Sequence, residues 1–435
     1  MLFHSINGDF VVARWTMRPA LSWLVVPRRP PVLIRPLRFL GMLVASSALA
    51  LAASAGCSSL KSADATNPGA DGGDAATADV AQPGDDASRD ADSNADAEPK
   101  AEVCTQTTCP VDVVEKGLYG PVSIAVDGTH LYWIEVGAVP PVNRGELVRI
   151  KKTIGCATRS CFDVLDPNVL DGQLSGQNIY EAHVALGQND VCYTQSFNTN
   201  AQHSIRCFAL ADPNLAKRAL DDGAGAVIDL WVGGSEARWV LGSSNVGVAD
   251  GAVMGRALVA GPTKTLAPGR VASSGVTSDG AKVYWSEWGA ASPQGSINTL
   301  LGDGGVSAIA TGRANPIAVR LHGQYLYWIE AAKRTVMRAR ADGTSASEQI
   351  ATTDVNPIDL VVDAGGVYWI TSGQGTSGIA GSLSHAPLTP GGDITIMIKD
   401  INLVYALAAD TTDVYVASVG QLIADGQIVR IKKTK

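Results

Sequence analysis

A phrase of two adjacent aromatic residues recurs along this chain of 435 residues. Its clear copies read LYWIE twice, VYWSE and VYWIT, and three weaker copies align with them without gaps. The residue five positions before each aromatic pair serves as a reference, and the spacings between references are 60, 46, 46, 43, 41 and 47 residues. A repeat of this length is typical of propellers and other repetitive architectures. The seven references are Asp127, Gly187, Gly233, Asp279, His322, Asp363 and Asp410.

Apolar residues alternate on both sides of each reference position. The third residue before it is aliphatic in every copy, and the sixth residue after it is aromatic in six copies. This alternation around a Gly or Asp-Gly turn indicates a β-hairpin with one buried face. Segments such as 145–150 and 426–431 supply a third strand, and segments such as 162–166 and 264–268 supply a fourth. Four antiparallel strands per repeat predict an all-β fold, a seven-bladed β-propeller.

The ends of the repeat region predict how the ring closes. The last repeat ends after its third strand, close to the C-terminus, so its blade lacks an outer strand. Val111–Val114 has the pattern of an outer strand and precedes the first blade. We therefore expect this N-terminal strand to pair beside Ile428–Ile431 and remove an open sheet edge.

The motifs DGTHLYWIE, SDGAKVYWSE and RARADGT resemble those of the YWTD propellers of low-density-lipoprotein-receptor-type proteins. The likeness covers most of residues 111–435 and implies a ligand-binding module without catalytic activity. The chain departs from that family in three ways. It has seven copies instead of six, Glu in place of the family's Asp after the aromatic pair, and no clear motif in copies two, three and seven.

The first 103 residues predict export and anchoring. Six arginines precede an apolar run that ends in small residues, so residues 1–56 are expected to be a signal peptide. Ser54-Ala55-Gly56-Cys57 resembles the lipobox of bacterial lipoproteins, which implies lipidation of Cys57; cleavage without lipidation is the alternative. Residues 57–103 are rich in Ala and Asp and should form a disordered linker. The propeller domain would then span 104–435.

Six further cysteines lie in the exported part of the chain. In an oxidising compartment they indicate disulfides, with local pairing favoured by two C-x4-C spacings and one pair fifteen residues apart. A zinc site is the rival interpretation, although no histidine lies near these spacings. The six are Cys104, Cys109, Cys156, Cys161, Cys192 and Cys207.

Charge and composition limit the possible partners. The chain has 46 glycines and only 17% charged residues, which suits an all-β protein with many turns. Acidic residues outnumber Lys and Arg by 42 to 34, which argues against nucleic acid as a partner.

Candidate site residues lie where the repeats differ from one another, because a repeat departs from its own pattern where function intervenes. The fourth residue before the reference should lie near one mouth of the central channel. At this level the sequence offers polar side chains that could bind a ligand, form an acid-base pair or simply solvate the channel. Glu and Arg residues that recur at equivalent positions of several blades are better explained by contacts between strands. The ligand-binding candidates are Ser123, His183, Asp229 and Asp359, with Trp231 and Arg320 two positions further along.

These observations favour an exported binding module for a protein, a glycan or a small ligand. We expect a monomer in the bacterial cell envelope, held to the membrane only by a lipid anchor, or a secreted protein if Cys57 is not lipidated. No metal or cofactor is expected. The alternatives are a propeller enzyme, resembling bacterial lyases and lactonases with a site at the channel mouth, and a structural envelope protein.

Overall fold

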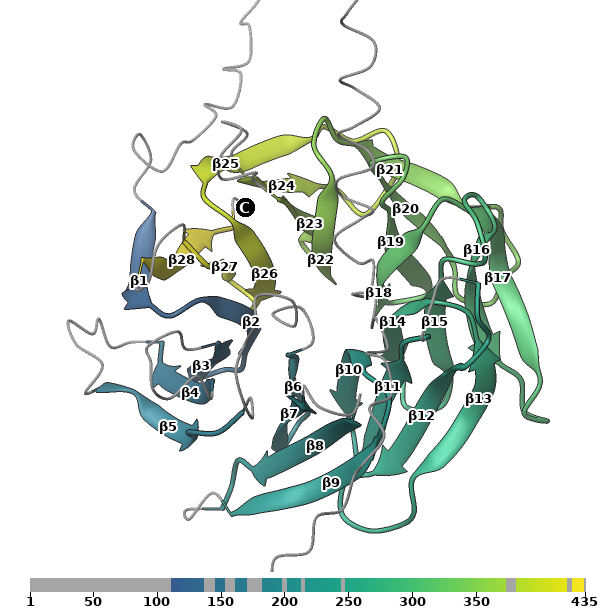
Figure 1. Cartoon of the computed structure of the whole chain (residues 1–435). Coiled ribbons are helices and arrows are strands. Elements are labelled where there is room, and N and C mark those ends of the chain that lie inside the picture. The colour runs from purple at the N-terminus through teal and green to yellow at the C-terminus, as the bar shows by residue number, and fades with distance from the viewer. Residues whose placement is uncertain are drawn as a thin grey trace, which may run out of the picture. The chain divides into compact units, whose positions relative to one another are not determined.

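Seven four-stranded antiparallel sheets stand around a common axis in the computed structural model of the chain (Figure 1). The structure describes residues 111–136, 145–152, 161–169, 182–197, 202–212, 216–243, 247–372, 381–420 and 425–433. Each sheet is one blade, and within these ranges no helix accompanies the strands. The prediction of a seven-bladed propeller is confirmed.

The strands follow one another outward from the axis in blades 1 to 6. Blade 1 consists of β2 (Pro121–Val126), β3 (His130–Glu135), β4 (Glu146–Lys151) and β5 (Asp163–Asp166). Blade 2 consists of β6 (Val184–Leu186), β7 (Asp190–Phe197), β8 (Gln202–Ala209) and β9 (Lys217–Ala224). Blade 3 consists of β10 (Val227–Gly233), β11 (Glu236–Leu241), β12 (Gly251–Ala257) and β13 (Lys264–Arg270).

The remaining blades repeat this order. Blade 4 consists of β14 (Ser273–Ser278), β15 (Val283–Glu287), β16 (Gly295–Leu300) and β17 (Val306–Arg313). Blade 5 consists of β18 (Pro316–His322), β19 (Tyr325–Glu330), β20 (Thr335–Arg340) and β21 (Glu348–Thr352). Blade 6 consists of β22 (Pro357–Asp363), β23 (Gly366–Thr371), β24 (Gly381–Ala386) and β25 (Thr395–Ile401). Blade 7 consists of β26 (Val404–Ala409), β27 (Asp413–Ser418), β28 (Gly426–Lys432) and, from the other end of the chain, β1 (Asp112–Leu118).

Blade 7 closes the ring as the sequence predicts. β1 pairs with β28 in an antiparallel ladder that sets Asp112 opposite Arg430 and Val113 opposite Val429. The guanidinium of Arg430 also lies 2.6 Å from the carboxylate of Asp112. Figure 1 shows the blue N-terminal strand beside the yellow C-terminal strands. The two ends of the repeat region therefore share one sheet, which covers an edge that would otherwise be open.

The aromatic phrase fills the space between neighbouring blades. The five tryptophans at this repeat position are at most 1% exposed. Trp133, for example, lies edge-on against Phe162 of its own blade and in one apolar cluster with Tyr415 of blade 7. Burying a side chain of this size contributes about 2–3 kcal/mol by area. The five are Trp133, Trp239, Trp285, Trp328 and Trp369.

The reference Asp and the first aromatic residue of the phrase form one hydrogen-bonded unit. In blade 1 the carboxylate of Asp127 accepts hydrogen bonds from the backbone N–H groups of Thr129 and His130, and from the hydroxyl of Tyr132 at 2.8 Å. Asp410 makes the same set in blade 7. An Asp side chain that caps its own turn in this way fixes the hairpin, which explains why the two residue types recur together.

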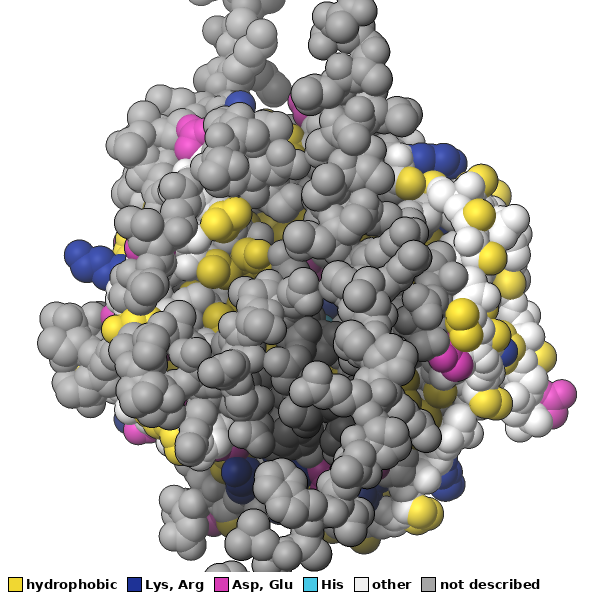
Figure 2. Space-filling model, in the orientation of Figure 1, with side chains coloured by type: hydrophobic (Ala, Val, Ile, Leu, Met, Phe, Trp, Pro, Cys, Tyr) yellow, Lys and Arg dark blue, Asp and Glu magenta, His cyan; other side chains and the backbone are white. Residues whose placement is uncertain are grey.

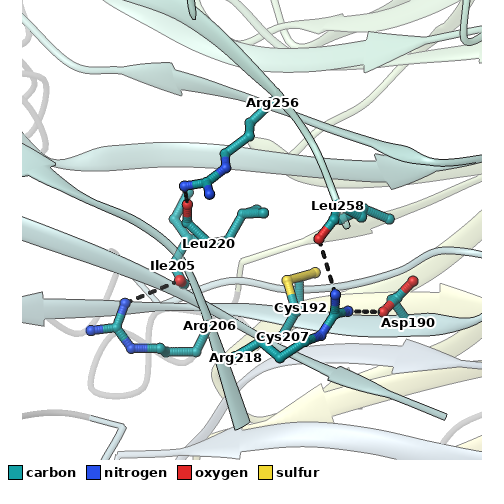
Figure 3. Close-up of a disulfide and its surroundings, with 9 residues drawn as sticks. All are labelled: Asp190, Cys192, Ile205, Arg206, Cys207, Arg218, Leu220, Arg256 and Leu258. Atoms are coloured by element: carbon teal, nitrogen blue, oxygen red, sulfur yellow. Dashed lines mark hydrogen bonds and ion pairs between the residues drawn. A yellow bond between two sulfur atoms is a disulfide. The ribbon is translucent and has the colours of Figure 1, made fainter. Parts of the chain in front are cut away.

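A disulfide joins Cys192 on β7 to Cys207 on β8, where the two residues lie directly opposite each other (Figure 3). It lies at the contact with blade 3, because the neighbouring Arg218 pairs with Asp190 and donates a hydrogen bond to the carbonyl of Leu258. Cys161 is disulfide-bonded as well. Cys104, Cys109 and Cys156 lie outside the described residues, as do the predicted signal peptide, Cys57 and the linker.

Candidate functional site

The inner strands of the blades line the axis, and most of them carry a β-bulge at the same level. The register shifts just before the candidate position in blades 1, 3, 4, 6 and 7. A bulge inserts an extra residue, bends the strand and turns a side chain away from its regular direction. The repeated bulge therefore directs the residue after it toward the channel and the next blade.

Three of the candidate residues hold neighbouring inner strands together. The hydroxyl of Ser123 in blade 1 accepts a hydrogen bond from the N–H of Val184 in blade 2 at 3.0 Å. The carboxylate of Asp229 accepts one from the N–H of Val276 in blade 4, also at 3.0 Å. Asp359 is hydrogen-bonded to the backbone of Leu407 in blade 7 in the corresponding way. A polar residue at this level thus joins one blade to the next.

Arg320 connects blades that are not neighbours. Its Nη1 lies 3.3 Å from Oδ2 of Asp229 in blade 3, and its Nη2 lies 3.2 Å from Oδ1 of Asp359 in blade 6. The same Nη1 donates to the carbonyl of Val319 at 3.0 Å. Side chains of blades 3, 5 and 6 therefore meet in one charged cluster within the channel.

The backbone near Arg320 departs from the repeat. In β18 the register shift extends from Ile317 to Arg320, and Ala318 has a φ of 52°. A left-handed conformation is costly for any residue with a Cβ, and such strain often accompanies functional sites. Blade 4 accommodates this bulge with Gly275, where a Cβ would lie 3.0 Å from the backbone nitrogen of Val319. The distorted strand presents an arginine where the other blades present Ala, Trp, Thr or Val.

His183 adds an imidazole next to this cluster. Its ring interacts electrostatically with Asp229 and Arg320, and burial lowers its pKa, so the ring is neutral at pH 7. The ring is hydrogen-bonded to the backbone of Val227, whereas Nε2 is buried and has no hydrogen-bond partner. Since a bond to a carbonyl requires a ring N–H, Nδ1 carries the proton and Nε2 keeps its lone pair.

The charges of the cluster do not balance. Two carboxylates face one guanidinium, and the imidazole is neutral. Burial raises the pKa of Asp359 to about 6, while Arg320 opposes this rise and Asp229 adds to it. The two carboxylates in turn raise the pKa of Arg320. Above pH 6 the cluster therefore carries a net negative charge.

Trp231 takes part in apolar packing. Its ring packs over Gly233, where a Cβ would come within 2.4 Å of the indole, and it contacts the apolar cluster between blades 3 and 4.

Among the described residues no group of three or more His, Cys, Asp or Glu side chains is placed to hold a metal ion. No helix in the described part of the chain is long and apolar enough to cross a membrane.

The recurring Glu residues bind to groups of their own blade and of the preceding blade. The carboxylate of Glu135 accepts hydrogen bonds from the indole of Trp133 at 3.1 Å and from the N–H of Tyr119 at 3.0 Å. Glu330 lies 3.2 Å from Arg313. These contacts explain the repetition of Glu after the aromatic phrase without a catalytic role.

Sequence reasoning missed a second buried cluster, which joins blades 2 and 3. The ring of His203 lies with Nδ1 2.8 Å from the carbonyl of Gly225 and Nε2 3.0 Å from Asp221. Both partners offer acceptor oxygens, so the ring bridges a backbone carbonyl and a carboxylate. Thr263 of blade 3 donates to the same carboxylate at 2.5 Å. The sequence contained one signal that could have indicated this cluster. A histidine lies in an expected third strand, and a pair of acidic residues lies in the strand that follows it.

The described surface of the ring carries charged side chains of both signs and scattered apolar ones. Figure 2 shows acidic and basic side chains of the described residues interspersed around the rim of one face. The large apolar side chains that are exposed in the described residues are spread over blades 1, 3, 4, 6 and 7. They are Val113, Val164, Val248, Val259, Leu301, Val306 and Ile394.

No protein-family model and no curated protein matches the chain. Solved structures do. Selenomethionine-substituted virginiamycin B lyase from Staphylococcus aureus is 11% identical, with 74% of this chain and 97% of that chain covered and a TM-score of 0.51. A streptogramin B lyase structure is 9% identical over 74% of this chain and 96% of that chain, with a TM-score of 0.49. A nidogen/laminin complex is 15% identical over 50% of this chain and 83% of that chain, with a TM-score of 0.39. At 11% identity the likeness to the virginiamycin B lyase extends to the propeller fold alone.

Proposed function

We propose that the chain is an exported, lipid-anchored propeller that binds a ligand at the charged cluster of its central channel. The observation that carries this proposal is the convergence of Arg320 with Asp229 and Asp359 from blades 3 and 6. The strained backbone at Ala318 supports it, because the distorted strand presents Arg320 to the cluster.

The location follows from the N-terminal segment. A signal peptide, a lipid on Cys57 and an acidic linker would hold the ring away from a membrane surface in the cell envelope. The disulfide between Cys192 and Cys207 supports an oxidising compartment. The acidic excess of the chain favours a partner other than nucleic acid.

Native mass spectrometry tests the proposal. The purified full-length chain is incubated with a small-molecule extract of the cell envelope, and the adducts that it retains are weighed. We expect an adduct on the wild-type chain that Arg320→Gln and Asp359→Asn lose and that Arg340→Gln keeps. Arg340 is a matched control, because it belongs to the same blade and pairs with Asp342 on the surface. Absence of an adduct, or its full retention by both channel variants, would contradict the proposal.

A second candidate function is acid-base catalysis at the same cluster. Asp359 has a pKa of about 6 and shares its surroundings with the neutral imidazole of His183. Groups that titrate near neutrality are suited to proton transfer. If the ring is an enzyme, extract components will be consumed with time by the wild-type chain but not by His183→Gln. An extract whose composition stays constant during prolonged incubation would exclude this function for the compounds present.

A further inference from the structure

We propose that the channel cluster selects a small organic cation, a ligand that carries a primary ammonium or guanidinium group. This inference rests on the proposed function and adds the chemical class of the ligand. It follows from the charges and the hydrogen-bonding groups that Asp229, Asp359, Arg320 and His183 place together.

The negative charges exceed what the fold needs at this level. Ser123 joins blade 1 to blade 2 with a neutral hydroxyl, through the same type of hydrogen bond that Asp229 makes to blade 4. A carboxylate is therefore not required to connect two inner strands. Blades 3 and 6 nevertheless use one each, and burying a charge carries a penalty. The two Asp residues thus supply charge beyond their role in joining the strands.

Arg320 compensates only one of these charges. Its two terminal nitrogens already contact the two carboxylates and the carbonyl of Val319. An anionic ligand would have to displace a carboxylate from the guanidinium and would meet a net negative charge. A cationic ligand instead adds the positive charge that the cluster lacks, and Coulomb attraction is strong where water is partly excluded.

The free hydrogen-bonding capacity of the cluster is that of an acceptor. Nε2 of His183 has a lone pair and no partner among the described residues. Carboxylate oxygens also only accept. Ammonium and guanidinium groups provide several N–H donors and accept nothing, so they match this arrangement.

A bare metal ion fits the same cluster less well. Each carboxylate is held by a different nitrogen of Arg320, and each is also bound to the backbone of its own and the next blade. Two carboxylates fixed in this manner cannot both turn toward a small ion without losing these contacts. Metal coordination requires three or more converging ligands, and the described residues contain no such group.

Saturation-transfer NMR with three probes of equal length tests the inference. The purified full-length chain is titrated at pH 7.5 and constant ionic strength with n-butylammonium, n-butanol or butyrate. We expect saturable binding of butylammonium, at least tenfold weaker binding of the alcohol, and none of the carboxylate. Asp359→Asn should weaken the binding of butylammonium about tenfold, whereas Asp303→Asn, in an exposed turn of blade 4, should leave it unchanged.

The outcomes separate this inference from the proposed function. Binding of butyrate, or binding of butanol as tight as that of butylammonium, would overturn the preference for cations; if Asp359→Asn alters this binding, the channel remains a binding site. Butylammonium binding that is unchanged in Asp359→Asn would overturn the inference as well. So would the absence of saturable binding up to about 50 mM, the order of dissociation constant that a ligand of so few atoms can reach. Butylammonium binding that Asp359→Asn and not Asp303→Asn weakens would support it. Circular dichroism of both variants verifies that they are folded.

Discussion

At the scale of single residues, the buried charge of Asp359 works against stability. Its pKa is raised to about 6 from an ordinary 3.8, chiefly by burial. The folded chain then binds more protons than the unfolded chain between these values, so stability falls as pH rises from 3.8 to 6. The full penalty is present above pH 6 and is about 1–3 kcal/mol.

Asp359→Asn should therefore stabilise the protein at pH 7.5 by about 1–3 kcal/mol. Asn keeps an oxygen that can accept the hydrogen bond from the N–H of Leu360, and Arg320 keeps Asp229 as a partner. The free energy of unfolding in urea, measured for both chains at pH 4 and pH 7.5, checks this. The gain should nearly vanish at pH 4. A variant that is less stable than wild type at pH 7.5 would contradict the role assigned to burial.

This residue also shows what the sequence could reveal of the site. The equivalent inner-strand positions could be predicted from the repeat, because each lies at a fixed number of residues before the aromatic pair and therefore at the same height in the channel. The contact of Arg320 with Asp229 could not be predicted, since 91 residues and a whole blade separate them. It depends on a bulge with Ala318 at positive φ and on the absence of a side chain at Gly275. Trp231 shares the same face of its strand but packs onto Gly233.

At the scale of strands, two adjacent Asp residues of β9 allow a matched comparison. The side chain of Asp221 is 13% exposed and lies against the buried ring of His203, whereas that of Asp222 is 59% exposed and pairs with Arg206. Removing one partner of a buried hydrogen bond leaves a polar group unsatisfied, which costs about 1–3 kcal/mol. A surface pair contributes at most about 1 kcal/mol.

We therefore expect Asp221→Asn to lower the free energy of unfolding by about 2 kcal/mol and Asp222→Asn by less than about 1 kcal/mol. Thermal unfolding of the two variants, followed by near-ultraviolet circular dichroism, gives the ranking. Since the hydrogen bond from His203 helps to lower the pKa of Asp221, the effect of Asp221→Asn should shrink as the pH falls below about 4. Equal effects of the two substitutions would show that the contact between blades 2 and 3 does not depend on this pair.

The closing ladder permits a covalent test at the same scale. Asp112 on β1 lies opposite Arg430 on β28, so Asp112→Cys with Arg430→Cys should form a disulfide in oxidising buffer. Because the bond would close a loop of most of the domain, it should stabilise the chain by about 5–6 kcal/mol in the chain-entropy model. Mass spectrometry of proteolytic peptides and the shift in melting temperature check both expectations. Failure of the pair to oxidise, with each single variant well folded, would argue against the observed ladder.

At the scale of the whole molecule, the architecture was predictable because the pattern of a four-stranded blade recurs along the sequence. Alternation, turn residues and buried tryptophans agree in most repeats, and such agreement across levels specifies one fold. Blade 2 carries the weakest motif: it has Gly187 in place of Asp and no tryptophan, and it holds the disulfide between Cys192 and Cys207. A covalent bond between its two middle strands stabilises the blade where the repeated apolar residues are poorest.

Membrane attachment is a property of the whole chain that the ring itself does not determine. If Cys57 carries a lipid, the full-length chain expressed in a bacterial host should partition into the detergent phase of Triton X-114 and incorporate radiolabelled palmitate. Cys57→Ser should move it to the aqueous phase and abolish labelling, because loss of the acyl chains removes about 0.8 kcal/mol per buried CH₂ group. The melting temperature of the ring should be the same in both proteins. Aqueous partitioning of the wild-type chain would instead indicate simple secretion, with the same propeller released from the cell.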